Sequence, residues 1–510
     1  MSTKNEVRSV AFRNPFELEI LDASVEQWLP ELEARLTSDA YTPDTATLIE
    51  LPKARGLVRP IALMSLRDRV VYNACVHACF DAIFAELAWA QGTKDFAYRL
   101  SRPAKAPPWF KNAFKGWDSF RRASLANLSE RGSVAITDVA AFYENISIKL
   151  LLSDLRALGS PEHPLRVLSA CLNRWCQVEG RGLPQDSYAS HVLAKLYLQP
   201  LDRMLQHHHL LHARYSDDMR IFCHTEEEAQ RALVETARTL RRRGLSLQGA
   251  KTRVISGEDA RHLIEGRTPT IARIRRQWRQ AVLDSMQAGE NSPYLTSGEI
   301  DQLIRDDPGR IPLAVIRDAF DAFVAEREQS GFDKSIFHFL LNRLAAAKDK
   351  HALPHLAPLL ADFPQETPFI LRYVRRAESE SEFEPSLLGF LRTAQGGVYD
   401  AQRLLVFAWW ADGDAHPSDE AISLARDVAL DEAARPMMRA AARAVLARRA
   451  ELSDLERLLD EYERSRDELE KAQIICCLGR LERSRLRAFT GRVHGDGALP
   501  RYAAAWLATR

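Results

Sequence analysis

The stretch HARYSDDMRIFCHT, residues 212–225, carries the most informative pattern in the chain. Apolar residues on both sides of a polar centre predict a strand, a tight turn at Ser216-Asp217-Asp218 and a second strand. Two aspartates in a turn are, taken alone, a common feature of solvated surfaces. Their significance therefore depends on the segments around them.

Strand-like and helix-like segments lie on both sides of this hairpin. SVAITDVAAFYENI, residues 133–146, opens with an apolar run that ends at Thr137-Asp138. Residues 188–205 and 226–243 have helical patterns, and a further strand follows the second of them. Upstream, residues 48–64 read as two short strands around a basic turn. The order of strand, helix, hairpin, helix and strand predicts an α+β fold rather than a doubly wound sheet.

Three carboxylates mark the ends of these predicted strands: Asp138, Asp217 and Asp218. If the strands are neighbours in one sheet, the three side chains converge. Converging carboxylates repel one another, so they are tolerated when a cation binds between them. Two Mg²⁺ ions held in this way activate a 3′-hydroxyl and stabilise a pyrophosphate leaving group. The pattern favours a site for phosphoryl transfer.

Four segments follow one another in the order of a known family. They are ITDVAAFYENI (136–146), GLPQDSYASHVLAKLYLQPLD (182–202), RYSDDMRIF (214–222) and LSLQGAKTRV (245–254). The series resembles motifs A to D in the palm of reverse transcriptases. LPKARGLVRPIALMSLRDRVV (51–71) resembles the fingers of the same family. The resemblance implies the fingers and palm of a right-hand polymerase, with the activity of an RNA-directed DNA polymerase-like nucleotidyltransferase.

The resemblance also implies roles for the residues at these motifs. Asp138 and Asp217 would bind two Mg²⁺ ions, or Mn²⁺, with support from Asp218 and from the carbonyl of Val139. Lys251 would protonate the leaving group.

A second group of residues would meet the incoming nucleotide. Tyr143 would be a steric gate that excludes a 2′-hydroxyl and so selects dNTPs, although palm packing is an alternative role for it. Gln185 would lie along the nucleotide. Lys53, Arg59 and Arg69 would meet the triphosphate, because positive charge offsets the charge that develops on pyrophosphate.

Two positions depart from the family pattern. Asp186-Ser187 stands where the family usually has glycine followed by proline or a similar residue, and glycine there lets the backbone approach template or nucleotide closely. Lys195 stands where the family often has Asn. Both departures argue against ordinary templated synthesis but not against nucleotidyl transfer.

The second half of the chain differs in character. After residue 270 the sequence predicts helices at 311–328, 334–348, 354–362, 385–395, 400–411, 418–429, 434–448, 453–465, 468–480 and 483–491. Their lengths and short breaks suit a HEAT-like helical-repeat domain. We expect an N-terminal region with fingers (1–130), a palm (131–265), a basic linker (266–290) and the helical domain (291–510). In the linker, Arg275, Arg276, Trp278 and Arg279 are candidates for binding nucleic acid.

A helical domain in place of a thumb is similar to the layout of bacterial abortive-infection and other defence-associated reverse transcriptases. That resemblance implies defence against bacteriophage, DNA synthesis that is untemplated and primed by the protein itself, and a homo-oligomer formed through the helical domain. The sequence does not choose a priming tyrosine among Tyr41, Tyr294, Tyr373, Tyr399, Tyr462 and Tyr502. Two alternatives stay open: a retron-like enzyme that copies a dedicated non-coding RNA, and an inactive palm that binds nucleic acid.

The amino-acid composition indicates the general class of the protein. The 510 residues are 46% hydrophobic and 27% charged, which is ordinary for globular proteins. The net charge of +1 conceals 40 Lys and Arg against 32 Asp and Glu in residues 1–280, followed by an acidic remainder. A basic first half suits a polyanionic ligand. The absence of a long apolar run or a signal peptide, together with seven scattered cysteines, predicts a cytoplasmic protein with reduced thiols and no membrane partner.

Overall fold

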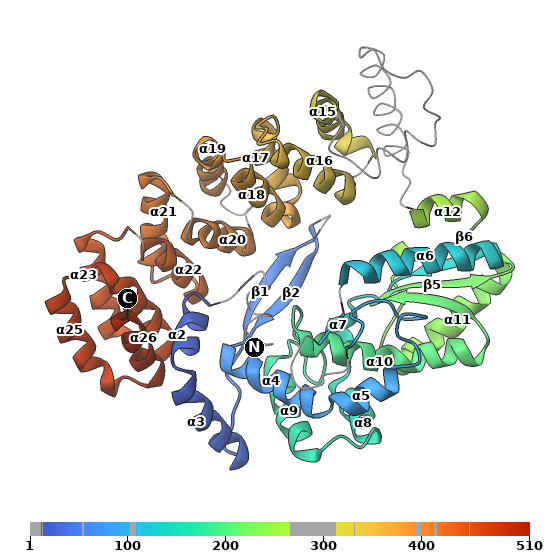
Figure 1. Ribbon diagram of the computed structural model, residues 1–510, viewed down its shortest axis with the longest axis horizontal. Helices are drawn as coiled ribbons and strands as arrows, with labels where there is room; N and C mark the ends of the chain where they lie inside the picture. Colours follow the sequence, from blue (N-terminus) through green and yellow to red (C-terminus); the bar gives the residue numbers. More distant parts are fainter. Residues whose placement is uncertain are drawn as a thin grey trace, which may run out of the picture. The chain divides into compact units, whose positions relative to one another are not determined.

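The computed structural model describes residues 12, 14–53, 56–101, 109–111, 113–265, 313–330, 332–393, 399–412, 416–447 and 449–509. The chain divides into two compact units (Figure 1). The first unit comprises Met1–Ile49 and Pro60–Gly266, and the second comprises Glu50–Arg59 and Arg267–Arg510. The basic linker candidates Arg275, Arg276, Trp278 and Arg279 lie outside the described residues.

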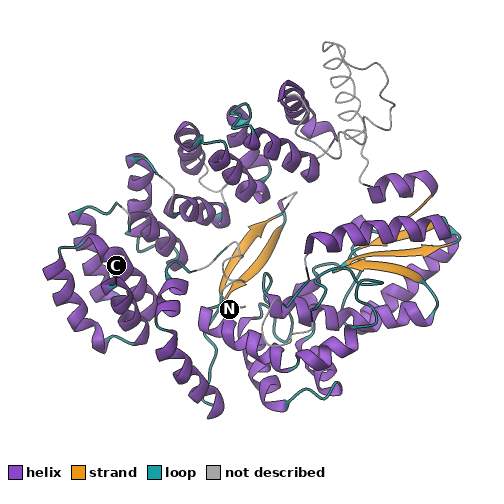
Figure 2. Cartoon of the chain, viewed as in Figure 1, coloured by secondary structure: helices purple, strands orange, loops and turns teal. Residues whose placement is uncertain are grey.

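The first unit is built around a four-stranded sheet with the order β4-β5-β3-β6 (Figure 2). The strands are β3 (Ser133–Thr137), β4 (Leu211–Tyr215), β5 (Asp218–Cys223) and β6 (Arg253–Ser256), and every neighbouring pair is antiparallel. The central strand β3 has four buried residues out of its five, because it has a partner on each edge and helices against it. The strand positions predicted at 133–146 and 212–225 are confirmed.

Helices cover this sheet (Figure 1). Helix α6 (Ala113–Arg131) packs on β4, β5 and β3, and α12 (Gly257–Glu265) packs on α6. Their apolar side chains join those of the sheet in one core, which includes Phe96, Phe120, Leu128, Val134, Ala213 and Phe222. The close approach of α6 requires glycine at 116, because a Cβ there would lie 2.7 Å from the carbonyl oxygen of Phe96.

The helix α11 (Glu226–Arg242) packs against β3, β5 and β6. It begins where Thr225 accepts a 3.2 Å hydrogen bond from the backbone N–H of Glu228. Acidic residues occupy its first turn and arginines its last, as the helix dipole favours. The long helix α10 (Tyr188–His207) is largely buried and contacts α4 (Leu66–Ala78), α5 (Phe80–Leu87) and α8 (Ile148–Ala157). Both predicted helices, at 188–205 and 226–243, are therefore confirmed.

Other helices also belong to the first unit. They are α2 (Glu17–Ala23), α3 (Val25–Thr37), α7 (Phe142–Asn145) and α9 (Glu162–Trp175). The predicted basic hairpin is also present, formed by β1 (Thr47–Pro52) and β2 (Val58–Leu63), and its turn is closed by a 2.7 Å hydrogen bond from the N–H of Lys53 to the carbonyl of Leu57. Residues 50–59 of this hairpin group with the second unit.

The described part of the second unit beyond residue 312 is helical. Its helices are α15 (Leu313–Ser330), α16 (Lys334–Ala346), α17 (Leu353–Asp362), α18 (Thr367–Arg376), α19 (Glu380–Thr393), α20 (Asp400–Ala411), α21 (Asp419–Ala429), α22 (Pro436–Leu446), α23 (Leu452–Arg464), α24 (Glu468–Cys477), α25 (Arg483–Arg492) and α26 (Ala498–Ala508). Alternate helices pack on each other along the series α16, α18, α20, α22, α24 and α26. This stacking is typical of a solenoid, and the HEAT-like assignment itself stays a prediction.

Two helices of this series, α18 and α26, were not among the predicted ones. A proline near the start of a helix is well tolerated, and α18 has Pro368 there. The helix expected from 385 begins earlier, at Glu380, so Pro385 lies inside α19. Within the described residues, no single helix has both the length and the apolar character needed to cross a membrane, whereas the bent pair α4 and α5 meets both criteria together.

Candidate active site

The hairpin between β4 and β5 presents two of the predicted carboxylates. Tyr215 pairs with Asp218, which leaves Ser216 and Asp217 as a two-residue turn. Ser216 has φ 59°, a left-handed conformation that hairpin turns of this length require and that non-glycine residues seldom adopt. Strain of this kind concentrates at functional sites.

The third carboxylate, Asp138, directly follows β3. The antiparallel register pairs Thr137 with Met219. One step further in the same register, Asp138 lies opposite Asp218, the residue before Met219. The carbonyl of Asp138 accepts a 2.7 Å hydrogen bond from the N–H of Gln248, which fixes the backbone at this point. Strand pairing thus brings the three carboxylates to one end of the sheet.

The charges of these carboxylates interact. Desolvation raises the pKa of Asp217, and the charge of Asp138 raises it further. Desolvation, followed by the charges of Asp217 and Asp138, raises the pKa of Asp218 to about 6 although the residue stays exposed. The site therefore carries more negative charge than its own groups neutralise.

The ammonium group of Lys251 is a positive charge next to these carboxylates. Lys251 ends the short 3₁₀ helix η2 (Gly249–Lys251), and its Nζ donates to Oδ2 of Asp138. Desolvation opposes the charged form, but the bond to Asp138 outweighs it and the pKa of Lys251 is raised. An ammonium group that keeps its proton beside these carboxylates is placed to deliver a proton.

The donor chemistry of the three carboxylates fits a hard divalent cation, which prefers oxygen ligands. Their raised pKa values fit it too, because a bound cation would relieve the repulsion. As placed here, with Asp138 bonded to Lys251, they do not form a closed ligand set, and no group of three or more His, Cys, Asp or Glu in the described part of the chain does. Val139 is buried behind Asp138, and its role as a carbonyl ligand stays a prediction.

Tyr143 lies on α7, beside the β4–β5 hairpin. Burial raises its pKa well above the usual range, and the charge of Asp217 contributes in the same direction. Its hydroxyl forms a 2.7 Å hydrogen bond with Nδ1 of His191 on α10. The sequence analysis did not identify His191, because nothing in the local pattern links it to a residue 48 positions away.

The turn at residues 182–187 contains Asp186, one of the two departures from the family sequence. Asp186 has φ 63°, the left-handed conformation that a glycine adopts freely and that Asp tolerates better than most residues. Nη1 of the buried Arg69 donates to the carbonyl of Asp186 at 3.2 Å, so this arginine supports the turn. Gln185 and its neighbours line a cavity of about 160 Å³ with Trp175 and Arg181.

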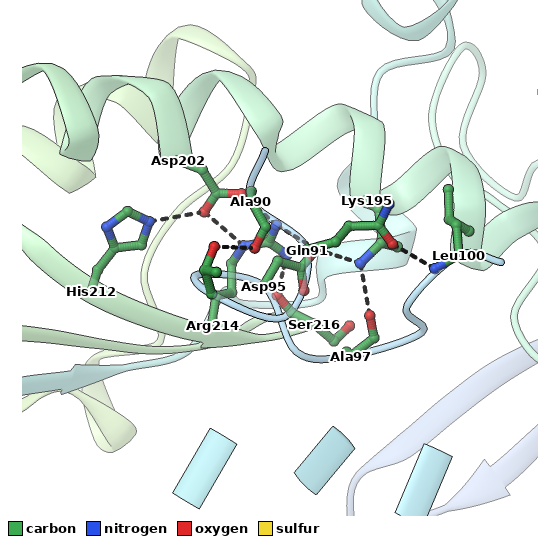
Figure 3. A network of polar contacts seen from close by, with 11 residues as sticks. Ala90, Gln91, Asp95, Ala97, Leu100, Lys195, Asp202, His212, Arg214 and Ser216 are labelled. Carbon is green, nitrogen blue, oxygen red and sulfur yellow. Dashed lines mark hydrogen bonds and ion pairs between the residues drawn. The ribbon is translucent and has the colours of Figure 1, made fainter. Parts of the chain in front are cut away.

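Lys195, the second departure, belongs to a buried network beneath the hairpin (Figure 3). Its Nζ donates to Oδ2 of Asp95 and to the carbonyl of Ala97 at 2.7 Å. Nη2 of Arg214 donates to the same Asp95 oxygen at 3.0 Å. Arg214 also donates two hydrogen bonds to the carboxylate of Asp202, at 3.0 and 2.5 Å. These four charged side chains are only 1–2% exposed.

This network reaches the turn between β4 and β5 through Arg214. Its Nη1 donates to the carbonyl of Ser216 at 2.9 Å (Figure 3). Burial alone would raise the pKa of Asp202, but the charge of Arg214 outweighs it and the pKa lies below the usual range. Nε2 of His212 is 3.5 Å from Asp202, which gives one of the histidines before the hairpin a structural position. Lys195 is therefore part of the support of the turn.

The other predicted residues are less constrained. Lys53 and Arg59 lie on the β1–β2 hairpin, and Arg59 is exposed. Their contact with a triphosphate stays a prediction. Most candidate priming tyrosines are poorly accessible: Tyr373, Tyr462 and Tyr502 are 2% exposed, and Tyr41 donates to Asp68 at 2.6 Å. Tyr399 is partly buried, and Tyr294 lies outside the described residues.

Comparisons with known proteins agree with this assembly of motifs. Residues 51–285 match the family described as reverse transcriptase (RNA-dependent DNA polymerase). The chain therefore contains a reverse transcriptase domain. Domains of this kind belong to the nucleotidyltransferase class and generally use divalent metal ions. No curated protein matches the chain.

Two solved structures are similar over much of the chain. One is telomerase from Candida albicans in complex with a fragment of telomeric RNA, at 11% identity and a TM-score of 0.36, covering 73% of this chain and 71% of that one. The other is telomerase from Candida tropicalis, also with telomeric RNA, at 10% identity and a TM-score of 0.33, covering 74% and 67%. These scores are too low to say more about this chain.

Proposed function

We propose that this chain is a DNA polymerase of the reverse transcriptase type that transfers nucleotides from dNTPs. The observation that carries the proposal is the strand register that sets Asp138 opposite Asp218 and beside Asp217. The mutual charge of these groups supports their role as ligands of two Mg²⁺ ions. When bound, the ions would activate the attacking hydroxyl and stabilise the pyrophosphate.

The protein's own residues have distinct tasks in this proposal. Asp138, Asp217 and Asp218 provide the negative pole of the site. Lys251, held at Asp138, gives its proton to the leaving pyrophosphate. Tyr143 forms a wall beside Asp217, against which a 2′-hydroxyl would clash.

The test is incorporation of labelled dNTPs by purified, nuclease-treated protein in the presence of Mg²⁺. Asp217→Asn removes one charge without changing shape, and we expect incorporation to fall by about 10³-fold or more. Asp81→Asn is a matched control, since Asp81 is an exposed carboxylate on α5 of the same unit. Equal incorporation by the wild type and Asp217→Asn would show that these carboxylates do not carry the activity. No incorporation either with or without added RNA would leave only the inactive, nucleic-acid-binding palm.

There are two alternatives for the way the sequence of the DNA product is determined: synthesis without a template and synthesis on an RNA template. The resemblance to abortive-infection enzymes supports untemplated, protein-primed synthesis in anti-phage defence by a homo-oligomer. Label that remains on the protein after denaturation, and is released by protease, is expected in that case. The burial of Tyr373, Tyr462 and Tyr502 narrows the search for a primer toward Tyr399 and residues outside the described ranges.

One observation favours the templated alternative. Asp186 has φ 63°, a conformation that glycine adopts freely, so its backbone is compatible with a position where the family usually has glycine. Synthesis that begins only when RNA is added would select this alternative. A defence role is tested separately, by plaque counts on bacteria that express the wild type or Asp217→Asn.

A further inference from the structure

Tyr143 has a polar partner on another helix, His191. The phenol oxygen and Nδ1 are 2.7 Å apart. The two rings stand almost perpendicular, with an interplanar angle of 86° and centroids 5.9 Å apart, so they meet through this bond rather than by stacking. The direction of the phenol therefore depends on where the imidazole is fixed.

The imidazole is itself held in place by aromatic neighbours. Tyr98 stacks on it with centroids 3.8 Å apart and planes 12° apart. Phe110 contacts both Tyr98 and His191, at 5.6 and 6.3 Å between centroids. The backbone N–H of His191 donates to the carbonyl of Ser187, the residue that precedes α10, at 3.1 Å. His191 thus has little freedom to turn away from Tyr143.

The protonation states suit a hydrogen bond of one direction. Burial, followed by the charge of Lys195, lowers the pKa of His191 to about 3, so the ring is neutral near pH 7. Burial raises the pKa of Tyr143, so its hydroxyl keeps its proton. The phenol donates and Nδ1 accepts, which places the histidine proton on Nε2.

The position of Tyr143 relative to the carboxylates gives this bond a consequence. Its hydroxyl also interacts with Ser216, and the charge of Asp217 reaches it. The ring thus borders the place where the sugar of a nucleotide bound at these carboxylates would lie. A ring that can swing excludes a 2′-hydroxyl less well than one that is anchored.

We infer that His191 is a positioning residue that anchors Tyr143 and thereby sets how strongly the enzyme discriminates deoxyribonucleotides from ribonucleotides. This inference rests on the proposed polymerase function. It assigns a role to a residue that has no contact with the three carboxylates in the structure and that works through the gate residue alone.

The test measures the ratio of kcat/KM for dATP over ATP in a set of variants. His191→Phe keeps a ring against Tyr98 but cannot accept the bond, and Tyr143→Phe removes the donor. We expect each to lower the ratio by about 3- to 10-fold, the range for loss of one buried hydrogen bond. Because both remove the same bond, the double variant should show no further loss.

A conservative variant separates positioning from packing. His191→Asn places an amide oxygen near the position of Nδ1 and should keep the ratio within about twofold of the wild type. If His191→Phe lowers kcat for both nucleotides alike and leaves the ratio unchanged, the residue is structural and the inference is wrong. An additive double variant would overturn it as well.

Failure of the proposed function would be distinguishable from failure of this inference. If the wild type incorporates neither nucleotide, the polymerase proposal fails, and the gate is then tested by calorimetric binding of dATP and ATP in the presence of Mg²⁺. Preferential dATP binding that His191→Phe weakens by 3- to 10-fold would support the anchor. Equal affinity for both nucleotides in the wild type would overturn it.

Discussion

The two units of this protein use charged side chains in opposite ways. In the first unit, Lys195, Asp95, Arg214 and Asp202 are buried together in one network beside the β4–β5 turn. In the second unit, ion pairs recur along the helical stack between segments 28 to 37 residues apart. Examples are Arg317–Asp349, Lys350–Glu382, Arg375–Asp412, Arg392–Glu420, Arg426–Asp454 and Arg464–Glu432.

The difference lies in how much each charge depends on the others. A buried charge that loses its partner keeps its desolvation penalty, so the network in the first unit is sensitive to any single removal. Most pairs in the stack have a partner that water can reach, and each joins one pair of neighbouring segments. The first arrangement fixes one local geometry, and the second spreads small contributions along a series of helices.

The largest expected effect comes from breaking the buried network. Arg214→Met leaves Asp95 and Asp202 buried without this cation, and we expect the free energy of unfolding of the first unit to fall by about 3–5 kcal/mol. Because the chain has two units, the measurement is a urea titration read by hydrogen exchange of peptides from β4 and β5. If the free energy of unfolding falls by less than about 1 kcal/mol, the two carboxylates do not carry the desolvation penalty expected of buried charges that have lost this cation.

An intermediate effect is expected from the carboxylates. The folded-state pKa of Asp218, about 6, lies above its unfolded value, so the folded state binds the proton more tightly and stability falls as the pH rises from about 4 to 6. Asp218→Asn should remove this loss and stabilise the metal-free protein by about 1 kcal/mol at pH 7.5, because solvent screens the exposed group. At pH 4 the variant and the wild type should be equally stable.

Magnesium provides the complementary measurement for the same variant. Added Mg²⁺ should raise the melting temperature of the wild type at pH 7.5 and raise that of Asp218→Asn less, since binding to the folded state alone stabilises it. A variant that is less stable than the wild type at pH 7.5 without metal would contradict the sign of the charge repulsion.

The smallest effect is expected in the helical stack. Arg392→Met removes one partner of a pair whose two side chains are both about half exposed, and unfolding of the second unit should change by about 0.5 kcal/mol or less. The same urea titration, read on peptides from α19 and α21, measures it. A change as large as that for Arg214→Met would erase the contrast between the units.

Much of the fold followed from local pattern. The hairpin around Asp217, the strand before Asp138 and the helix from Tyr188 lie within two residues of their predicted positions, because alternation and helical spacing are local signals. Most helices of the second unit are also close to prediction. Helix α18 was missed because prolines beside it suggest a break, although one of them lies in its first turn.

The contacts around the site were beyond such signals. Lys195 reads as a departure from a family pattern, and only the fold shows its partner, Asp95, which lies 100 residues away. His191 and Tyr143 are 48 residues apart and belong to different helices. Asp186 was interpreted as an obstacle because a sequence shows the side chain and not the backbone angle. Long-range pairing and backbone conformation were the missing information.

Four non-glycine residues near the site have left-handed backbones: Tyr98, Ala141, Asp186 and Ser216, with φ between 40° and 63°. Glycine would relieve the strain at each of them, at the expense of a side chain that contacts or shapes the site. Laboratory evolution for heat resistance alone should therefore favour glycine at Ala141, Asp186 and Ser216, whereas selection for DNA synthesis should retain the present residues. Tyr98 differs from these three, because its ring stacks on His191 and the packing lost would exceed the strain relieved. The other three sites would then record which of the two pressures a population has experienced.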